Sequence, residues 1–266
     1  MSAAALTQRA GRQVGEWIPA LVILVAMLAA WEGSILLFHI KQFLLPKPTT
    51  IATTFWNERQ SLWPAGWYTF KEALGGFFGG SIAGILFATL VARFRMVGKA
   101  LMPIAIAANA IPIIAFAPIF DAWFDPLSPH SKMAIAGVLC FFPVMVNTLR
   151  GLQSVQPRQI ELMRAYAASD LEIFRRVRVP TALPYVFTAL KVASVLAMIG
   201  AIVAEYFGGS FDALGVLIRN DAQTFEFPTA WAGIAVASLL GITLYLAVAI
   251  TERLVVRWTP GARGSQ

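Results

Sequence analysis

The sequence predicts an all-α integral membrane protein, and two observations support this fold class. Hydrophobic residues make up 58% of the chain and charged residues only 13%, about half the charged share of an ordinary soluble domain. Six apolar stretches are each close to the roughly 20 residues that a helix needs to cross a bilayer. Because the 266 residues include no flexible linker, we expect a single membrane domain.

The six expected spans follow one another with short connections. They cover residues 17–39, 67–92, 100–123, 132–149, 185–206 and 229–250. The first span is too long for the apolar core of a secretory signal, and no small-x-small cleavage site follows it, so we expect it to be retained. The lone cysteine, Cys140, lies in an apolar run and excludes an internal disulfide.

The distribution of basic residues predicts the orientation. Fourteen fall on one side of the six spans: Arg9, Arg12, Arg93, Arg95, Lys99, Arg150, Arg158, Arg164, Arg175, Arg176, Arg178, Arg253, Arg257 and Arg263. Five fall on the other side: Lys41, Lys47, Arg59, Lys132 and Arg219. Basic residues accumulate on the cytoplasmic side, so both termini are expected there. We therefore divide the chain into a cytoplasmic segment (1–16), a transmembrane domain (17–252) and a cytoplasmic tail (253–266).

Glycines in the second span form a stripe of bare backbone. Gly76, Gly80 and Gly84 recur every fourth residue beside a second pair, Gly75 and Gly79. Such stripes let helices approach closely in lipid. Packing within one subunit and association between subunits are both open from the sequence.

The third span is expected to be a broken helix that borders a pathway. Pro103, Pro112 and Pro118 each remove a backbone donor, which a membrane tolerates where other helices or a watery cavity compensate. Asn109 in this span and Asn147 in the fourth are polar at membrane depth, where a polar side chain is often functional. We predict pathway roles for Asn109, Pro112 and Asn147, with helix capping or interhelical bonding as the alternative for Asn147.

The sequence favours a transport component over an enzyme. Four acidic residues, Glu32, Glu72, Asp121 and Glu205, lie in or near spans. We interpret them as interfacial residues that snorkel or bond locally, and we include Glu205 among the pathway candidates. The two histidines are far apart, so we expect no metal site. The chain contains no nucleophile motif and no phosphate loop. The +7 net charge fits the cytoplasmic bias better than nucleic-acid binding.

One polar, basic stretch interrupts this apolar chain. Residues 161–184 read ELMRAYAASDLEIFRRVRVPTALP, and good or neutral helix formers fill 161–179 before Pro180 and Pro184 limit the helix. Small residues cluster at Ala165, Ala167, Ala168 and Ser169, which would fit a narrow groove on a partner protein. Contact with anionic lipid is the alternative.

This stretch resembles the cytoplasmic loop of ABC-importer membrane subunits, in the binding-protein-dependent permease family, whose signature runs E-A-A, then Gly, then I-x-L-P. Glu161 corresponds to the signature's Glu, and Ala168-Ser169 to the A-S that usually follows its glycine. Leu162 and Met163 replace the usual alanines, and Ala167 replaces the glycine, which predicts a continuous helix here. The stretches IPIIAFAPIFDAWF (111–124), SKMAIAGVLCFFPVMVNTLRGLQSV (131–155) and VAEYFGGSFDALGVLI (203–218) resemble the same family.

The resemblance implies a type I importer fold of about six transmembrane helices, with both termini cytoplasmic. Two copies would enclose the pathway, a heterodimer being the alternative. A separate cytoplasmic ABC ATPase dimer would bind the ATP and magnesium, and an extracytoplasmic solute-binding protein would deliver substrate near residues 121–131 and 208–227. The residues expected to couple to the ATPase are Glu161, Arg164, Ala167, Ala168, Ser169, Asp170, Phe174 and Pro180.

Within the family, the pattern resembles the branch that imports taurine, alkanesulfonates, nitrate, thiamine-precursor pyrimidines and riboflavin. PIFDAWF and VAEYFGGS favour the last two substrates, whereas Asp125 departs from a position where the family often has glycine. Two other classes stay open. A secondary transporter would need inverted repeats and intramembrane charges, and a purely structural membrane protein would leave the proline-rich span and the asparagines without a purpose.

Overall fold

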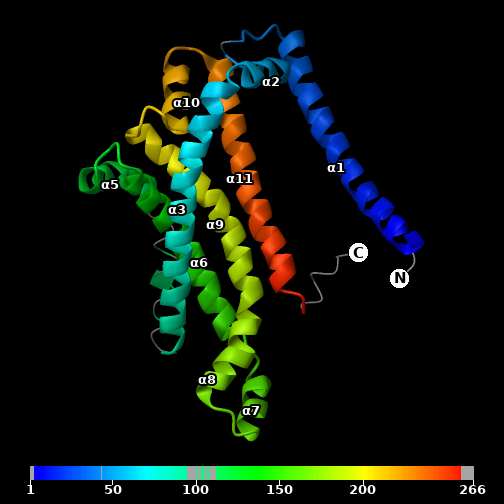
Figure 1. Cartoon of the computed structure of the whole chain (residues 1–266), viewed down its shortest axis with the longest axis vertical. Helices are drawn as coiled ribbons and strands as arrows, with labels where there is room; N and C mark the ends of the chain where they lie inside the picture. Colours follow the sequence, from blue (N-terminus) through cyan, green and yellow to red (C-terminus); the bar gives the residue numbers. More distant parts are fainter. Residues whose placement is uncertain are drawn as a thin grey trace.

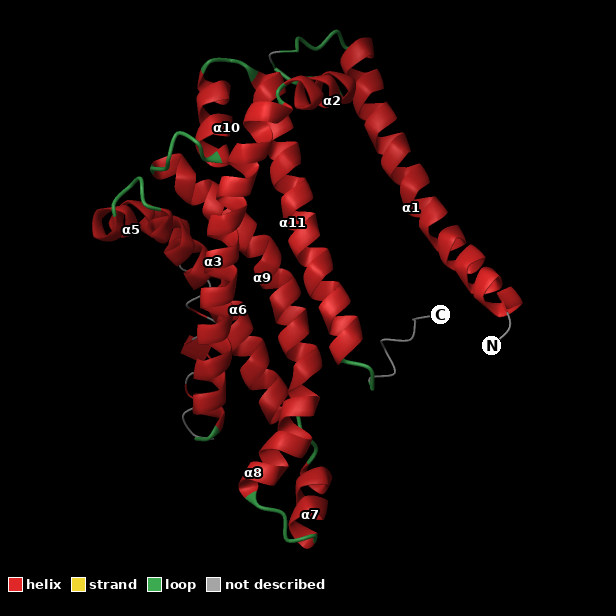
Figure 2. Cartoon of the chain, in the orientation of Figure 1, coloured by secondary structure: helices red, strands yellow, loops and turns green. Residues whose placement is uncertain are grey.

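The computed structural model describes residues 3–42, 44–94, 100, 103, 104, 107 and 112–258. All regular elements in this part of the chain are helices (Figure 2). They are α1 (Ala3–Leu37), α2 (Pro48–Asn57), α3 (Arg59–Ala92), η1 (Ile113–Phe116), α5 (Ala117–Phe124), α6 (Pro129–Gln153), α7 (Pro157–Ala165), α8 (Asp170–Ile173), the π-turn η2 (Phe174–Arg178), α9 (Val179–Phe207), α10 (Leu214–Gln223) and α11 (Phe227–Val255).

Four helices in the described part are long and apolar enough to cross a membrane: Arg59–Ala92, Pro129–Gln153, Asp170–Phe207 and Phe227–Val255. They contain the second, fourth, fifth and sixth expected spans. The first expected span falls in α1, whose apolar part is Leu21–Leu37. In the third, residues 101, 102, 105, 106 and 108–111 lie outside the described residues. The part from residue 112 onward is a 3-10 turn that leads into the eight-residue helix α5.

Helices α3, α6, α9 and α11 form a bundle, and the short helices lie at its two ends (Figure 1). Helices α2, α5 and α10 lie at one end, whereas α7 and α8 project from the other beyond the ends of α3 and α11. Helix α1 begins and α11 ends toward the end that carries α7 and α8. We call this the inner end because its basic residues predict a cytoplasmic location.

The glycine stripe of α3 packs against α6 of the same chain. A Cβ atom added to Gly76 would lie 2.5 Å from the Cβ of Ala136, and one added to Gly80 would lie 2.1 Å from the carbonyl oxygen of Gly137. At Gly84 the nearest atom would be the Phe141 carbonyl oxygen, 2.8 Å away. Packing inside one subunit therefore explains these three glycines. Gly79 faces open space in the single chain.

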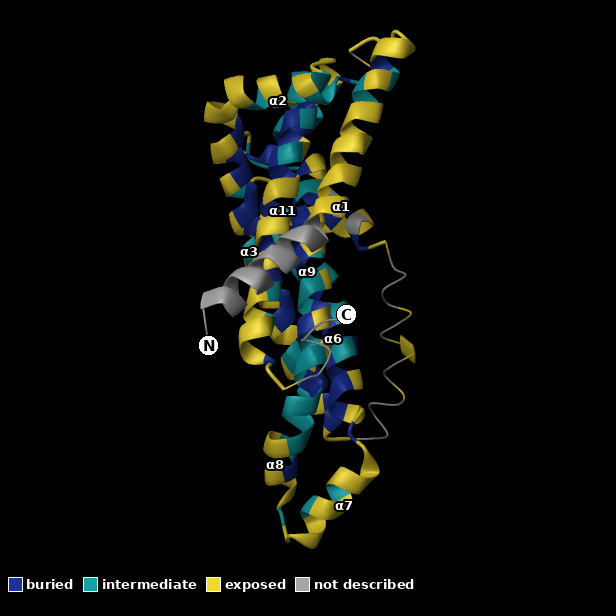
Figure 3. Cartoon of the chain, turned by 90° about the vertical axis from the view of Figure 1, so that its right-hand side faces the viewer, coloured by how far each residue is buried: buried dark blue, intermediate teal, exposed yellow. Residues whose placement is uncertain are grey.

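Helix α9 buries a stripe of small side chains in the centre of the bundle. Ala189, Ala193, Ala197 and Ala201 recur every fourth residue and are all fully buried. As in other membrane helices, small residues allow the backbones to approach closely, so that dispersion contacts hold the bundle together. The buried faces turn inward, and the outer faces of α1, α3 and α11 carry exposed residues suited to lipid (Figure 3).

Helix α1 stands apart from the bundle along most of its length and meets it near α2 (Figure 1). The Glu32 carboxylate accepts hydrogen bonds from the Thr49 hydroxyl at 2.6 Å and the Thr49 amide at 3.2 Å, which ties α1 to the start of α2. The rings of Trp31 and Trp231 also meet, with centroids 5.3 Å apart. The interpretation of Glu32 as a locally bonded residue is therefore confirmed.

Candidate functional site

The polar stretch folds into two short helices joined by a tight turn, which we call the α7–α8 hairpin (residues 157–173). Helix α7 ends at Ala165, and the Ala168 amide then donates to the Met163 carbonyl at 3.0 Å while the Ala167 amide donates to the Arg164 carbonyl at 2.9 Å. This pair of bonds is a Schellman motif, whose C′ residue needs a left-handed backbone. Ala167 supplies it with φ of 56°.

The prediction of a continuous helix through Ala167 is therefore wrong. The chain turns where glycine is usual in the family, even though alanine carries a steric cost of about 1–2 kcal/mol in the left-handed region. The hydrogen bonds on both sides of the turn explain why it still forms. Ala167 therefore has the left-handed backbone conformation that glycine usually adopts, although its side chain is that of alanine.

A capping box begins the second arm of the hairpin. The Ser169 amide donates to the Glu172 carboxylate at 2.9 Å, and the Glu172 amide donates to the Ser169 hydroxyl at 3.3 Å. These reciprocal bonds satisfy backbone donors that a helix start leaves unpaired. Ser169 therefore starts α8, and the spacing S-x-x-E was readable in the sequence.

The hairpin is fixed to the bundle by its second arm. Ile173 is buried, and Phe174 packs against a cluster from α3, α6 and α9 that includes Ala92, Met145 and Leu149. Helix α8 runs through the π-turn η2 directly into α9. A movement of the hairpin tip would therefore act on a membrane-spanning helix without an intervening loop.

The tip of the hairpin presents a mixed polar and apolar surface. Glu161, Arg164 and Asp170 are exposed, and the Arg164 and Asp170 side chains form a loose ion pair at 4.0 Å. These three side chains border a hollow of about 770 Å³ between the hairpin and the inner end of α3. The large apolar side chains of Leu162, Tyr166 and Leu171 are also exposed. Such a surface suits contact with another protein.

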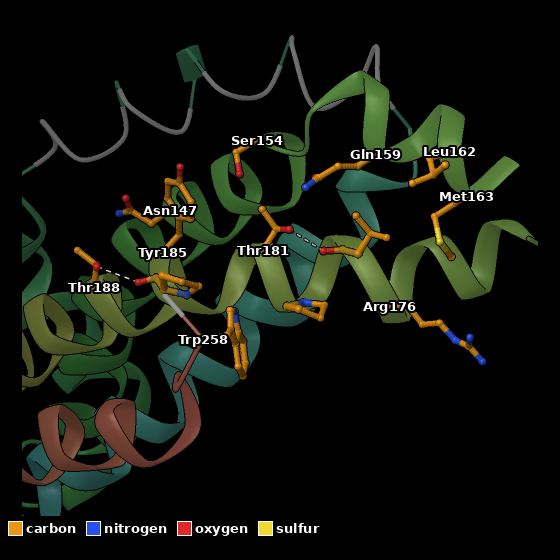
Figure 4. Close-up of a pocket in the computed structure, with 13 residues that line it drawn as sticks. Asn147, Ser154, Gln159, Leu162, Met163, Arg176, Thr181, Tyr185, Thr188 and Trp258 are labelled. Atoms are coloured by element: carbon orange, nitrogen blue, oxygen red, sulfur yellow. Dashed lines mark hydrogen bonds between the residues drawn. The ribbon is translucent and has the colours of Figure 1, made fainter. Parts of the chain in front are cut away.

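A larger cavity of about 940 Å³ opens on another side of the hairpin (Figure 4). It is lined by Asn147, Ser154, Gln159, Leu162, Met163, Arg176, Val177, Pro180, Thr181, Pro184, Tyr185, Thr188 and Trp258. The amide nitrogen of Asn147 donates to the Pro143 carbonyl at 2.8 Å, and among the described residues its amide oxygen has no donor. The hydroxyls of Thr181 and Thr188 donate to carbonyls of their own helix, which leaves their lone pairs available.

Two of the other predicted pathway residues, Pro112 and Glu205, lie away from this cavity. Pro112 is exposed just before η1, and Asn109 lies outside the described residues. Glu205 is fully buried at the outer end of α9, where it accepts hydrogen bonds from Thr69 and from the amide of Gly215. Of the three predicted pathway residues that the structure describes, Asn147 alone therefore lines the cavity beside the hairpin.

Family comparison identifies the chain. Residues 80–258 match the family described as "Binding-protein-dependent transport system inner membrane component". The chain belongs to this family. The permease is 34% identical over 248 residues to the riboflavin transport system permease protein RibX of Chloroflexus aurantiacus, with 91% of each chain covered. It is 35% identical over 244 residues to the formylaminopyrimidine transport permease protein ThiX of Halalkalibacterium halodurans, covering 90% of this permease and 95% of that protein.

Structural comparison supports the fold. Inward-facing structures of the MetNI methionine ABC transporter match the permease with a TM-score of 0.52 at 21% identity, over 76% of this chain and 95% of that one. Together with the family match, this establishes the chain as a multi-pass permease of the ABC importer type, and the recognition from the sequence is confirmed.

Several residues that line the cavity were not predicted from the sequence. Thr181, Tyr185 and Thr188 follow one another at spacings of four and three residues, which places them on one face of a helix. This polar stripe at the start of an apolar span is visible in the sequence and could have indicated that the residues line a cavity. Trp258 had no such indication, because it comes from the far end of the permease and reaches the cavity only in the folded chain.

Glu72, Asp121 and Glu205 do not snorkel to the membrane surface, whereas Asp121 and Glu205 do form the hydrogen bonds to neighbouring residues that their interpretation included. All three are buried. Asp121 pairs with the equally buried Lys132 at 2.8 Å, a residue that the charge count had assigned to the outer surface. Their partners come from other helices of the permease, and a sequence does not display such contacts.

Proposed function

We propose that the permease is the membrane subunit of an ATP-driven importer, in which two copies enclose a pathway and each α7–α8 hairpin docks on a cytoplasmic ATPase subunit. The observation that carries this proposal is the hairpin itself. It projects beyond the bundle, exposes apolar side chains at its tip, and continues through η2 into α9. ATP binding and hydrolysis by the partner would move the hairpin and thereby α9.

The residues of the hairpin would divide this work. Glu161, Arg164 and Asp170 are exposed and would meet the ATPase. Ala167, Ala168 and Ser169 would set the shape of the tip through the turn and the capping box. Phe174 and Pro180 are half-buried at the base and would transmit the movement to the membrane domain.

The substrate that we propose is a small vitamin or vitamin precursor with a heteroaromatic ring, of the riboflavin or pyrimidine kind. RibX and ThiX, two relatives above 30% identity, carry transport names of this kind. The cavity of Figure 4 would form the inner mouth of the pathway, and it suits such a solute because Tyr185 and Trp258 offer ring surfaces beside the Asn147 amide. Arg176 is the charged residue among the described residues that line it.

An importer of taurine, alkanesulfonate or nitrate is the second candidate within the family. A permease named for aliphatic sulfonates, SsuC of Bacillus subtilis, is 26% identical over 265 residues, and Arg176 could attract an anion at the cavity. An extracytoplasmic binding protein would present either kind of solute at the outer end, near residues 121–131 and 208–227.

Reconstitution into liposomes tests the proposal. The permease would be combined with its ATPase and binding protein, and uptake of riboflavin and of formylaminopyrimidine would be compared with uptake of taurine and nitrate. We expect uptake that requires both the ATPase and ATP, with preference for a ring compound. Uptake that persists without the ATPase and follows a proton or sodium gradient would show a secondary transporter. Preference for taurine or nitrate would leave the importer class standing and overturn the substrate.

A further inference from the structure

Two buried carboxyl groups meet at the outer end of the bundle. Glu72 of α3 is 3% exposed and Glu205 of α9 is fully buried. Thr69, one turn before Glu72 on α3, donates to the Glu205 carboxylate at 2.7 Å, so both glutamates lie where α3 meets α9. Two carboxylates offer only acceptors, so a favourable contact between these groups needs a proton on one of them. Two negative charges in one buried site would also repel each other strongly.

Glu205 is the acceptor of the pair. Its Oε1 atom accepts from the Thr69 hydroxyl at 2.7 Å, and its Oε2 atom accepts from the Gly215 amide at 2.6 Å. Glu72 has the opposite environment, because its Oε2 atom is buried and receives no hydrogen bond from a described residue. An acceptor without a donor is costly in a buried site, whereas a protonated oxygen there donates. The proton therefore belongs on Glu72.

The surrounding charges do not remove the need for this proton. Lys132 of α6 is the nearby cation, but its ammonium group already bonds the Asp121 carboxylate of α5 at 2.8 Å and the Pro126 carbonyl. Asp121 also accepts a hydrogen bond from the Ser131 hydroxyl. The charges of Asp121 and Lys132 thus neutralise each other, so Lys132 does not compensate for a second negative charge on the two glutamates.

Among the described residues, Lys71 is the other cation beside the pair. It directly precedes Glu72, but it is exposed, and its ammonium lies 5.8 Å from the centre of the Tyr68 ring. Water screens an exposed cation, so Lys71 does not compensate for a second buried carboxylate.

We propose that Glu72 is a proton-binding site whose proton holds Glu205 as the anion that anchors the outer helix α10. The first two amides of α10 are bound from this site: Leu214 donates to the Thr69 hydroxyl at 2.9 Å, and Gly215 donates to Glu205. A carboxylate at a helix N-terminus is stabilised by the helix dipole. Gly215 fits because an added Cβ would lie 2.6 Å from Glu205 Oε2.

The anchored helix lies in the outer segment 208–227. If the proposed importer function holds, this segment is where a binding protein would dock, and loss of the proton at alkaline pH would loosen it. Glu72 is then a positioning residue, since it acts on α10 through Glu205. Because a proton held in the folded chain is lost as the pH rises, the resulting stability is present at low and neutral pH and disappears toward alkaline pH.

Infrared spectroscopy of the full chain in lipid tests the site directly. At neutral pH we expect the carbonyl band of a protonated carboxylic acid, and we expect that band to be lost in Glu72→Gln and to fade in the wild-type chain as the pH is raised. Glu252→Gln is the matched control: the Glu252 carboxylate accepts a hydrogen bond from the Lys191 ammonium at 2.7 Å, so its removal should leave the band unchanged. A wild-type chain without the band, or a Glu72→Gln chain that keeps it, would overturn the proposal.

A thermal unfolding series adds a second readout. Glu72→Gln retains a donor toward Glu205, so it is expected to unfold near the wild-type temperature at neutral pH and to lack the fall in unfolding temperature that deprotonation of Glu72 causes at alkaline pH. Glu72→Ala has no donor and should unfold at a lower temperature than the wild-type chain already at neutral pH. Equal behaviour of the two variants would contradict a donor role. Neither measurement uses the ATPase, the binding protein or a solute, so their failure would leave the importer proposal untouched.

Discussion

The contact between α3 and α6 makes a sharp prediction at two neighbouring glycines. Gly80→Ala places a Cβ atom 2.1 Å from the Gly137 carbonyl oxygen and within 2.9 Å of the Gly137 Cα atom, and real Cβ contacts almost never fall below 3.0 Å. The obstacle is backbone, so no side chain can turn aside. The two helices must separate by about 0.9 Å at this point, and overpacking of this kind costs about 1–3 kcal/mol.

Gly79→Ala is the matched control. It makes the same chemical change one residue away, at a position where an added Cβ meets no atom within 4 Å. Alanine is the better helix former by roughly 0.5–1 kcal/mol, so this variant should be neutral or slightly more stable. Unfolding temperature and oligomeric state would be measured for both variants in detergent.

We expect Gly80→Ala to unfold roughly 2–10 °C below the wild-type chain and Gly79→Ala to unfold at or above the wild-type temperature. A wild-type temperature for Gly80→Ala would refute the packing of this stripe within one chain. An equal loss in both variants, accompanied by dissociation, would show that another subunit covers the Gly79 face.

Two further predictions concern the ends of the bundle. Ala167→Gly should relieve the left-handed strain at the hairpin. The turn should gain about 0.5–1 kcal/mol of stability after the greater freedom of glycine in the unfolded chain is subtracted. Hydrogen exchange of the Ala168 amide should then slow roughly two- to fivefold, and faster exchange would contradict the Schellman geometry. At the outer end, burial first, and then the nearby Glu226 and Glu58, raise the pKa of Asp221, so its ionisation opposes folding and stability should fall as the pH rises through that pKa. Asp221→Asn should therefore raise the unfolding temperature at neutral and alkaline pH but not at acidic pH, and a gain that is the same at every pH would contradict the reasoning.

Hydropathy identified four of the membrane helices because each needs a long apolar stretch, and such a stretch is visible without tertiary information. The glycine stripe was equally visible, but its partner was not, since the partner is the backbone around Gly137 in another helix. The proline-rich third span was the least predictable, because three prolines leave several possible breaks.

Two residues that depart from the family pattern share one backbone feature, and only the departure at Ala167 led to a wrong prediction. Ala167 and Asp125 stand where glycine is usual or frequent, and both adopt positive φ, 56° and 77°. Local hydrogen bonds make this possible: the Schellman pair holds Ala167, and the Asp125 side chain accepts from the Leu127 amide at 2.8 Å. At Ala167 the residue type alone indicated that the turn is lost, whereas the surrounding hydrogen bonds preserve it.

The buried network around Glu205 could not be read from the chain. Thr69 lies 136 residues from Glu205, yet the two side chains are hydrogen-bonded. Lys132 and Asp121 each look like ordinary surface charges in the sequence. Only the fold shows that they neutralise each other inside the protein.

The central claim is that the α7–α8 hairpin docks on a cytoplasmic ATPase, and Ala168→Arg tests it most directly. Ala168 is half-buried within the tip, and a large charged side chain there should overfill the groove that receives the tip. Gln153→Arg, at an exposed position near the end of α6 and outside the hairpin, is the control. Co-purification with the ATPase is the measurement: we expect it to be lost in Ala168→Arg and kept in Gln153→Arg, with membrane insertion intact in both. Equal co-purification of the two variants would contradict the account.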